Sequence, residues 1–75
     1  MTDSPTALRK HSVTVAGHRT SITLEAAFWQ KLNAIAARRG IAVAALIAEI
    51  DGGRAGDPAD PNLSSAIRVY VLGSD

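Results

Sequence analysis

The chain has 75 residues, of which 47% are hydrophobic and 20% are charged, so its composition is that of one small globular domain and excludes a disordered chain. It contains no Cys and only two His, which excludes disulfides and argues against a structural zinc site. A core this small supplies only a few kcal/mol, and small domains commonly gain the remainder by oligomerisation. We therefore expect a homodimer that holds no metal and no cofactor.

The net charge of +1 is uninformative by itself, but the charges are unevenly distributed. Between Leu8 and Leu24 there are three basic residues and no acid, which indicates a basic N-terminal part suited to an anionic partner. The N-terminal residues contain no apolar segment typical of a signal peptide. The longest apolar run, from Ile41 to Ala48, is much shorter than the roughly 18 residues of a membrane span. These features predict a cytoplasmic protein without membrane contact.

Residues 1–8 are expected to form a disordered tail, followed by a single domain over residues 9–72. Residues 11–15 alternate weakly between polar and apolar, and residues 19–24 alternate clearly. The second run predicts a half-buried strand, because side chains along a strand point to opposite faces in turn. Its inner face would carry Ile22 and Leu24, and its outer face Arg19, Ser21 and Thr23.

Helical patterns follow the strand. An apolar stripe at helical spacing predicts a helix over about residues 25–39, with Thr23 as N-cap, Glu25 in the first turn and Gly40 as its C-terminal stop. A second helix is expected at about 42–51, a loop rich in Gly, Asp and Pro at 52–61, and a third helix at about 62–72. The last segment also alternates like a strand, although its start favours a helix.

Nothing in the sequence predicts an enzyme. No Ser lies in a nucleophile-elbow context, there is no thiol, and no Gly-rich phosphate loop precedes a helix. His11 and His18 share no helical face and have no carboxylate nearby, so we expect them to be solvent-exposed or hydrogen-bonded and not catalytic. We predict no catalytic and no metal-binding residues.

One strand followed by two helices is an incomplete arrangement, because a single strand cannot satisfy its own backbone groups. Antiparallel pairing of this strand between two chains would satisfy them. The resulting ribbon would carry Arg19, Ser21 and Thr23 outward, and a two-stranded ribbon fits the major groove of B-DNA.

This arrangement of segments resembles the ribbon-helix-helix superfamily of DNA-binding proteins. Within that superfamily the chain resembles a subfamily of small bacterial proteins, through Gly-His-Arg-Thr-Ser at 17–21, Phe28-Trp29 and Asn-Leu-Ser-Ser-Ala-Ile-Arg at 62–68. The resemblance covers roughly residues 9–72. It implies a mainly α fold with one short strand, in an intertwined dimer with an intermolecular antiparallel ribbon, plus a C-terminal helix.

The resemblance also implies a division of roles. Arg19, Ser21 and Thr23 would read bases, and the backbone amides near the start of the second helix, at Ile41, Ala42 and Val43, would contact phosphate. Many members have Ser or Thr at that start, whereas this chain continues with Ala and Val, so only backbone contacts are possible there. The expected dimer core consists of Ile22, Leu24, Phe28, Trp29, Leu32, Ile35, Leu46, Ile47 and Ile50.

The segment before the strand has two interpretations. Residues 11–15 could form a hairpin with residues 18–24, but the dimer would then hold a four-stranded sheet, too broad for a groove about 12 Å wide. Because Ala-Gly is a weak hairpin turn, we favour a mobile arm whose Arg9 and Lys10 contact phosphates.

The function that these features predict is that of a sequence-specific DNA-binding dimer that regulates transcription. One alternative is a protein-interaction or assembly module that keeps the fold without binding DNA. Another is an antitoxin whose C-terminal segment, from Asn62, engages a protein partner.

Overall fold

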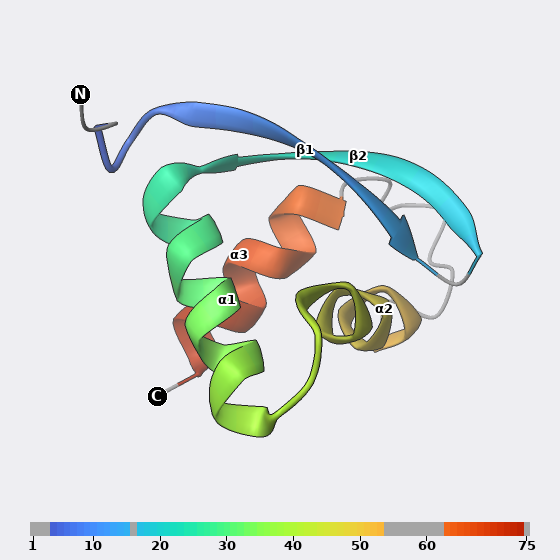
Figure 1. The fold of residues 1–75 in the computed structure, drawn as a ribbon. Coiled ribbons are helices and arrows are strands. Elements are labelled where there is room, and N and C mark those ends of the chain that lie inside the picture. Colours follow the sequence, from blue (N-terminus) through green and yellow to red (C-terminus); the bar gives the residue numbers. More distant parts are fainter. Residues whose placement is uncertain (1–3, 16, 54–62, 75) are drawn as a thin grey trace.

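The computed structural model describes residues 4–15, 17–53 and 63–74. In chain order these form β1 (Leu8–Val15), β2 (His18–Glu25), α1 (Ala26–Arg39), α2 (Val43–Gly53) and α3 (Leu63–Gly73). The two strands form a twisted antiparallel ribbon, and the three helices all lie on one side of it (Figure 1). Within the described ranges, no helix is long and apolar enough to cross a membrane.

The prediction of a single strand with a mobile arm before it was wrong. Residues 8–15 form β1, which pairs with β2 inside the same chain, from Leu8 opposite Glu25 to Val15 opposite His18. The strands are joined by two residues, of which Gly17 has a φ of 83°, a conformation that L residues rarely adopt. We refer to the β1–β2 pair as the ribbon. Because β2 already has a partner strand, the argument for a dimer from a lone strand no longer applies.

The start of α1 explains why residues 4–8 are not a disordered tail. Glu25 occupies the N-cap position without a side-chain capping bond, and Thr23 lies within β2, so the predicted Thr23 cap was wrong. The first amides of the helix instead donate to backbone carbonyls of the N-terminal segment: Ala26 to Ala7 at 2.9 Å and Ala27 to Pro5 at 3.0 Å. These bonds satisfy amides that have no partner inside the helix. Residues 1–3 of the predicted tail lie outside the described part.

Gly40 ends α1 as the sequence predicts. It adopts the left-handed conformation with a φ of 69°, and the Ile41 amide donates to the Ala36 carbonyl at 3.0 Å, which satisfies a terminal carbonyl of the helix. The helix α2 extends through Gly52 and Gly53, which the sequence had assigned to a loop. The other residues of that predicted loop lie outside the described ranges.

The core forms between the inner face of the ribbon and the three helices. Ile22 and Leu24 on β2 are buried against helical residues because the strand alternation directs them toward the helices. The buried cluster comprises Val15, Ile22, Leu24, Leu32, Ile35, Ala36, Leu46, Ile47, Ile67 and Val71. Of the nine residues predicted for a dimer core, six are buried within one chain, and Phe28, Trp29 and Ile50 pack around them. Their burial therefore does not require a second chain.

Candidate nucleic-acid interface

The face of the ribbon that points away from the helices is polar. Residues directly opposite each other in an antiparallel pair project to the same side, so the pairing register decides which side chains share this face. Three neighbouring pairs on it have both members exposed, and the end pair, exposed Leu8 with half-buried Glu25, continues the same row by its register. We call this surface the outer face; its pairs are Lys10 with Thr23, Ser12 with Ser21, and Thr14 with Arg19.

The two cations of the outer face lie at opposite corners. Lys10 stands near one end on β1 and Arg19 near the other end on β2. At about 3.3 Å per residue, they are separated by about 13 Å along the strands. Four hydroxyl side chains fill the area between them, and each hydroxyl both donates and accepts hydrogen bonds. The surface therefore combines positive charge with flexible hydrogen-bonding capacity.

The acid at the end of this surface is paired with a basic side chain. Glu25 ends β2, and its Oε1 accepts a hydrogen bond from Nε of Arg68 on α3 at 2.8 Å. That hydrogen bond is the main reason why the pKa of Glu25 is lowered from its usual value. The carboxylate is thus neutralised by α3, and the outer face keeps its positive character.

Arg9 and Lys10, predicted to act together, lie on different sides of the ribbon. Lys10 belongs to the outer face, whereas Arg9 is opposite Leu24 and so points to the side of the helices, where it remains exposed at the margin. Ile41 follows the end of α1 that is remote from the ribbon, and the chain then returns toward the ribbon to begin α2 at Val43 (Figure 1). The Ile41 amide, a predicted phosphate contact, is taken by the Ala36 carbonyl. One chain therefore brings Arg19, Ser21, Thr23 and Lys10 together, but not the other candidates.

The sequence reasoning did not identify Ser12 and Thr14 as members of this surface. Their alternation with Val13 and Val15 was the available signal, but it covers a short segment and was assigned to the arm. Only the pairing with β2 gives these two hydroxyls a face and neighbours.

His11 lies on the opposite, helix-facing side of β1. Its ring stacks on that of Trp29 from α1, with ring centroids 3.7 Å apart and an interplanar angle of 9°. The residue is half-buried, and its Nε2 is buried without a hydrogen-bond partner, so His11 is not freely solvent-exposed. Burial, and secondarily the charge of Arg9, lower the pKa of His11 and favour the neutral ring. The stack anchors β1 to α1.

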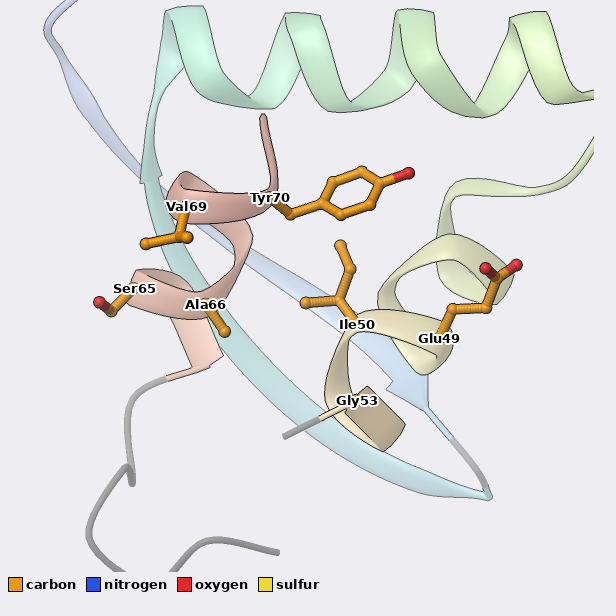
Figure 2. A pocket seen from close by; sticks show the side chains of 7 residues that line it. All are labelled: Glu49, Ile50, Gly53, Ser65, Ala66, Val69 and Tyr70. Atoms are coloured by element: carbon orange, nitrogen blue, oxygen red, sulfur yellow. The ribbon is translucent and has the colours of Figure 1, made fainter. Parts of the chain in front are cut away.

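A concave region lies between α2 and α3, with a volume of about 450 Å³ (Figure 2). Ile50 from α2 and Ala66, Val69 and Tyr70 from α3 supply much of its wall. The carboxylate of Glu49 at its margin accepts a hydrogen bond from Arg39 at 3.0 Å. The described residues contain no group of His, Asp and Glu able to hold a metal ion. The wall of this region is therefore mainly apolar, with Glu49, Ser65 and Tyr70 as its polar side chains.

Comparison with known proteins agrees with this architecture. A family described as "Ribbon-helix-helix domain" matches residues 8–74. Among solved structures, an uncharacterized protein from Bordetella pertussis Tohama I is similar, with 32% sequence identity and a TM-score of 0.76. The match covers 91% of this chain and 55% of that protein, so the chain spans little more than half of its length. No curated protein matches the chain.

Proposed function

Because this chain belongs to the family of ribbon-helix-helix domains, whose members generally bind DNA and form dimers, we propose that it is a sequence-specific DNA-binding protein that regulates transcription. The domain of this family is a regulatory, non-enzymatic one. The observation that carries the proposal is the outer face, which presents two cations and four hydroxyls on a narrow, exposed ribbon. Such a regulator would work in the cytoplasm of a bacterial cell.

The size and chemistry of the outer face suit the major groove. Two paired strands lie about 4.8 Å apart, so a ribbon with its side chains enters a groove about 12 Å wide. Arg19 can hydrogen-bond to O6 and N7 of guanine with its two terminal nitrogens, a contact that contributes about 1–3 kcal/mol of discrimination. Ser21 and Thr23 can address any base edge and therefore discriminate less strongly. We assign base reading to these three residues.

The remaining basic residues are assigned to phosphate. Lys10 lies at the corner of the outer face, where its flexible ammonium can reach the DNA backbone, and Arg9 lies at the margin of the other side. The Ile41 amide already donates to the Ala36 carbonyl, so the amides at Ala42 and Val43, at the start of α2, are the ones left as candidates for a phosphate contact. With Arg9 and Lys10 from two chains neutralising about four phosphates, the log–log salt slope is about −3.6.

The test is a fluorescence anisotropy titration against duplex DNA from the region upstream of the gene, with random duplex for comparison and several salt concentrations. Arg19→Ala should weaken binding to the specific site and reduce its margin over random DNA. Arg38→Ala is the matched control, because Arg38 is also exposed but lies in the last turn of α1. Equal affinities of wild type and Arg19→Ala for the specific site would refute base reading by Arg19. Absence of any binding at low salt would refute the proposed function.

A homodimer is part of the proposal, and α3 supplies the observation that favours it. Val69 and Leu72 expose 66% and 77% of their surfaces, and Val69 borders the apolar region beside Ile50. We propose a second copy of the chain as the partner here, because the family generally forms dimers and exposed apolar residues are typical of such contacts. Light scattering should give the mass of a dimer, and Leu72→Asp should shift it toward the monomer.

The same α3 surface favours the second candidate function, a protein-interaction module without DNA binding. DNA affinity and molecular mass, measured for wild type and Arg19→Ala, distinguish the two functions. Loss of DNA binding in Arg19→Ala with retained dimer mass supports the regulator. A dimer that binds no DNA at any salt concentration supports the interaction module.

A further inference from the structure

We propose that the stack of His11 on Trp29 is a pH-sensitive switch: the neutral imidazole holds the N-terminal part of β1 on α1, and protonation of the ring releases it. The released part comprises residues 4–11, which contain the start of β1 and the segment before it. The switch lies in the fold itself and does not depend on DNA binding. It gives a conformational role to a side chain that belongs to neither the outer face nor the region between α2 and α3.

The His11 ring holds a part of β1 that the apolar core does not reach. It lies nearly parallel to the ring of Trp29 on α1, with ring centroids 3.7 Å apart and an interplanar angle of 9°. After His11 the strand is held by the core, because Val13 packs against the buried cluster and Val15 belongs to it. Before His11, residues 8–10 are all exposed. The aromatic stack therefore fixes the first half of β1, whereas apolar burial fixes the second half.

The ring nitrogens of His11 favour the neutral form at this site. Nε2 is buried and has no hydrogen-bond partner, although buried polar atoms in folded proteins nearly always have one. The neutral ring suits the site with its proton on Nδ1, because Nε2 then carries only a lone pair. Protonation would add an N–H group at Nε2 with no acceptor, and would place a positive charge in a partly buried position. The ring therefore binds a proton more favourably after it has left the stack.

The immediate neighbours of the His11 ring also disfavour a cation. Arg9 projects to the same side of β1 two residues earlier, and its charge adds to the effect of burial in lowering the pKa of His11. Opposite His11 on β2 is the apolar Ile22, and the contact on α1 is Trp29, whose carbonyl accepts a hydrogen bond from Asn33. The indole face attracts a cation, but the lowered pKa means that burial and Arg9 outweigh this attraction.

Charged groups on the surrounding elements do not compensate a protonated ring. The acids on β2 and α2, which pack against β1, are Glu25, Glu49 and Asp51. Arg68 binds Glu25, Arg39 binds Glu49, and Asp51 also has an interaction partner. The basic residues on β2 and α1 are all exposed: His18, Arg19, Lys31, Arg38 and Arg39. None of these groups contributes to the lowered pKa of His11, so within the described ranges no carboxylate offsets a positive charge on the ring.

Release of this part of β1 would also free the start of α1. The Ala26 and Ala27 amides donate to the carbonyls of Ala7 and Pro5 at 2.9 and 3.0 Å, and amides in the first turn of a helix have no partner inside it. When the segment detaches, both amides become open to water. Lys10 moves with the segment, so one cation of the outer face loses its fixed position.

The experiment is amide hydrogen exchange of the full chain, followed by NMR from about pH 8 to about pH 5, the range in which histidine titrates. The protection factors of the Ala26 and Ala27 amides report the release. Because one proton is linked to it, they should fall by up to about tenfold per pH unit below about pH 6.5. The fall should end at the pKa of His11, which the chemical shifts of its ring protons give in the same samples. The Ile41 amide is the matched control, since it too is held by one backbone bond, at the other end of α1, and its protection should not change.

Two variants identify the group that binds the proton. His11→Phe keeps an aromatic ring against Trp29 but cannot be protonated, so protection at the start of α1 should not depend on pH. His18→Gln removes the other histidine of the chain and should keep the pH dependence of wild type. Constant protection of Ala26 in wild type, or an equal fall in His11→Phe, would overturn the inference. An equal fall at the Leu32 amide inside α1 would overturn it too, because acid would then unfold the whole chain and not release β1 alone.

Discussion

Replacing Gly17 with Ala should destabilise the protein by opening the ribbon at its turn. Gly17 has a φ of 83°, in the region that L side chains disfavour, and no atom lies within 4 Å of the position that a Cβ would occupy. The cost is therefore conformational and not steric. Because the left-handed conformation costs an L residue about 1–2 kcal/mol, we expect Gly17→Ala to lower the free energy of unfolding by that amount.

This loss is large for a domain of 75 residues. At about 0.05–0.15 kcal/mol per residue, its whole stability is about 4–11 kcal/mol. With an unfolding entropy of about 2.1 cal/mol/K per residue, about 0.16 kcal/mol/K in total, the loss corresponds to a fall in Tm of about 6–13 °C. Gly17→Asn should lose less than Gly17→Ala, because Asn tolerates the left-handed region better than other L residues.

The assay is thermal and urea unfolding followed by circular dichroism at one fixed protein concentration, since the proposed dimerisation would make Tm concentration-dependent. Gly52→Ala is the matched control: Gly52 lies in α2 without a positive φ, and an added Cβ meets nothing within 4 Å. This variant should be stabilised by up to about 1 kcal/mol. If Gly17→Ala is as stable as wild type or more stable, the chain does not turn at this residue, and the intrachain ribbon is refuted.

Three other predictions concern the core and the titrating groups. Leu32→Ala should cost about 2–5 kcal/mol, because this side chain has no exposed surface, whereas Gln30→Ala, at an exposed position of the same helix, should change stability by less than about 0.5 kcal/mol in urea unfolding. Burial lowers the pKa of His11, so the unfolded chain binds more protons at this residue than the folded chain does. The free energy of unfolding should therefore fall as pH drops below about 6.5. In urea titrations between pH 5 and 7.5, His11→Phe should flatten this pH dependence. The hydrogen bond from Arg68 lowers the pKa of Glu25. The stabilisation that this bond gives the folded chain is therefore present above about pH 4.5 and is lost as pH falls through the lowered pKa. The difference in free energy of unfolding between wild type and Arg68→Gln should vanish in acid.

Much of the helical architecture follows from local sequence signals. The apolar stripe from Phe28 to Ala36 and the glycine at position 40 predict a helix that the structure has at Ala26–Arg39, because helical periodicity and left-handed caps act within a few residues. The alternation in residues 19–24 likewise predicts a strand with Ile22 and Leu24 inward, and both are buried. These patterns arise from local spacing along the chain, so they can be interpreted without tertiary information.

The partner of that strand was decided by tertiary contacts. An Ala-Gly turn is a weak local signal, and β1 is held instead by contacts with residues far along the chain: His11 with Trp29, and the carbonyls of Pro5 and Ala7 with the start of α1. Each such contact forms only after the intervening chain has closed into a loop, which costs conformational entropy. A pattern of neighbouring residues therefore cannot predict these contacts.

The composition of the outer face was likewise decided by tertiary structure, through the register of the ribbon. A shift of one residue would transfer every side chain of β1 to the other side. In the observed register Lys10 and Ser12 lie beside Thr23 and Ser21, while Arg9 lies opposite Leu24. The sequence alone determined that hydroxyl and apolar residues alternate from Ser12 to Val15, after the basic residues Arg9 and Lys10. Which of these side chains share a surface depended on pairing with β2. That pairing places one side of β1 against the helices and leaves the other side exposed.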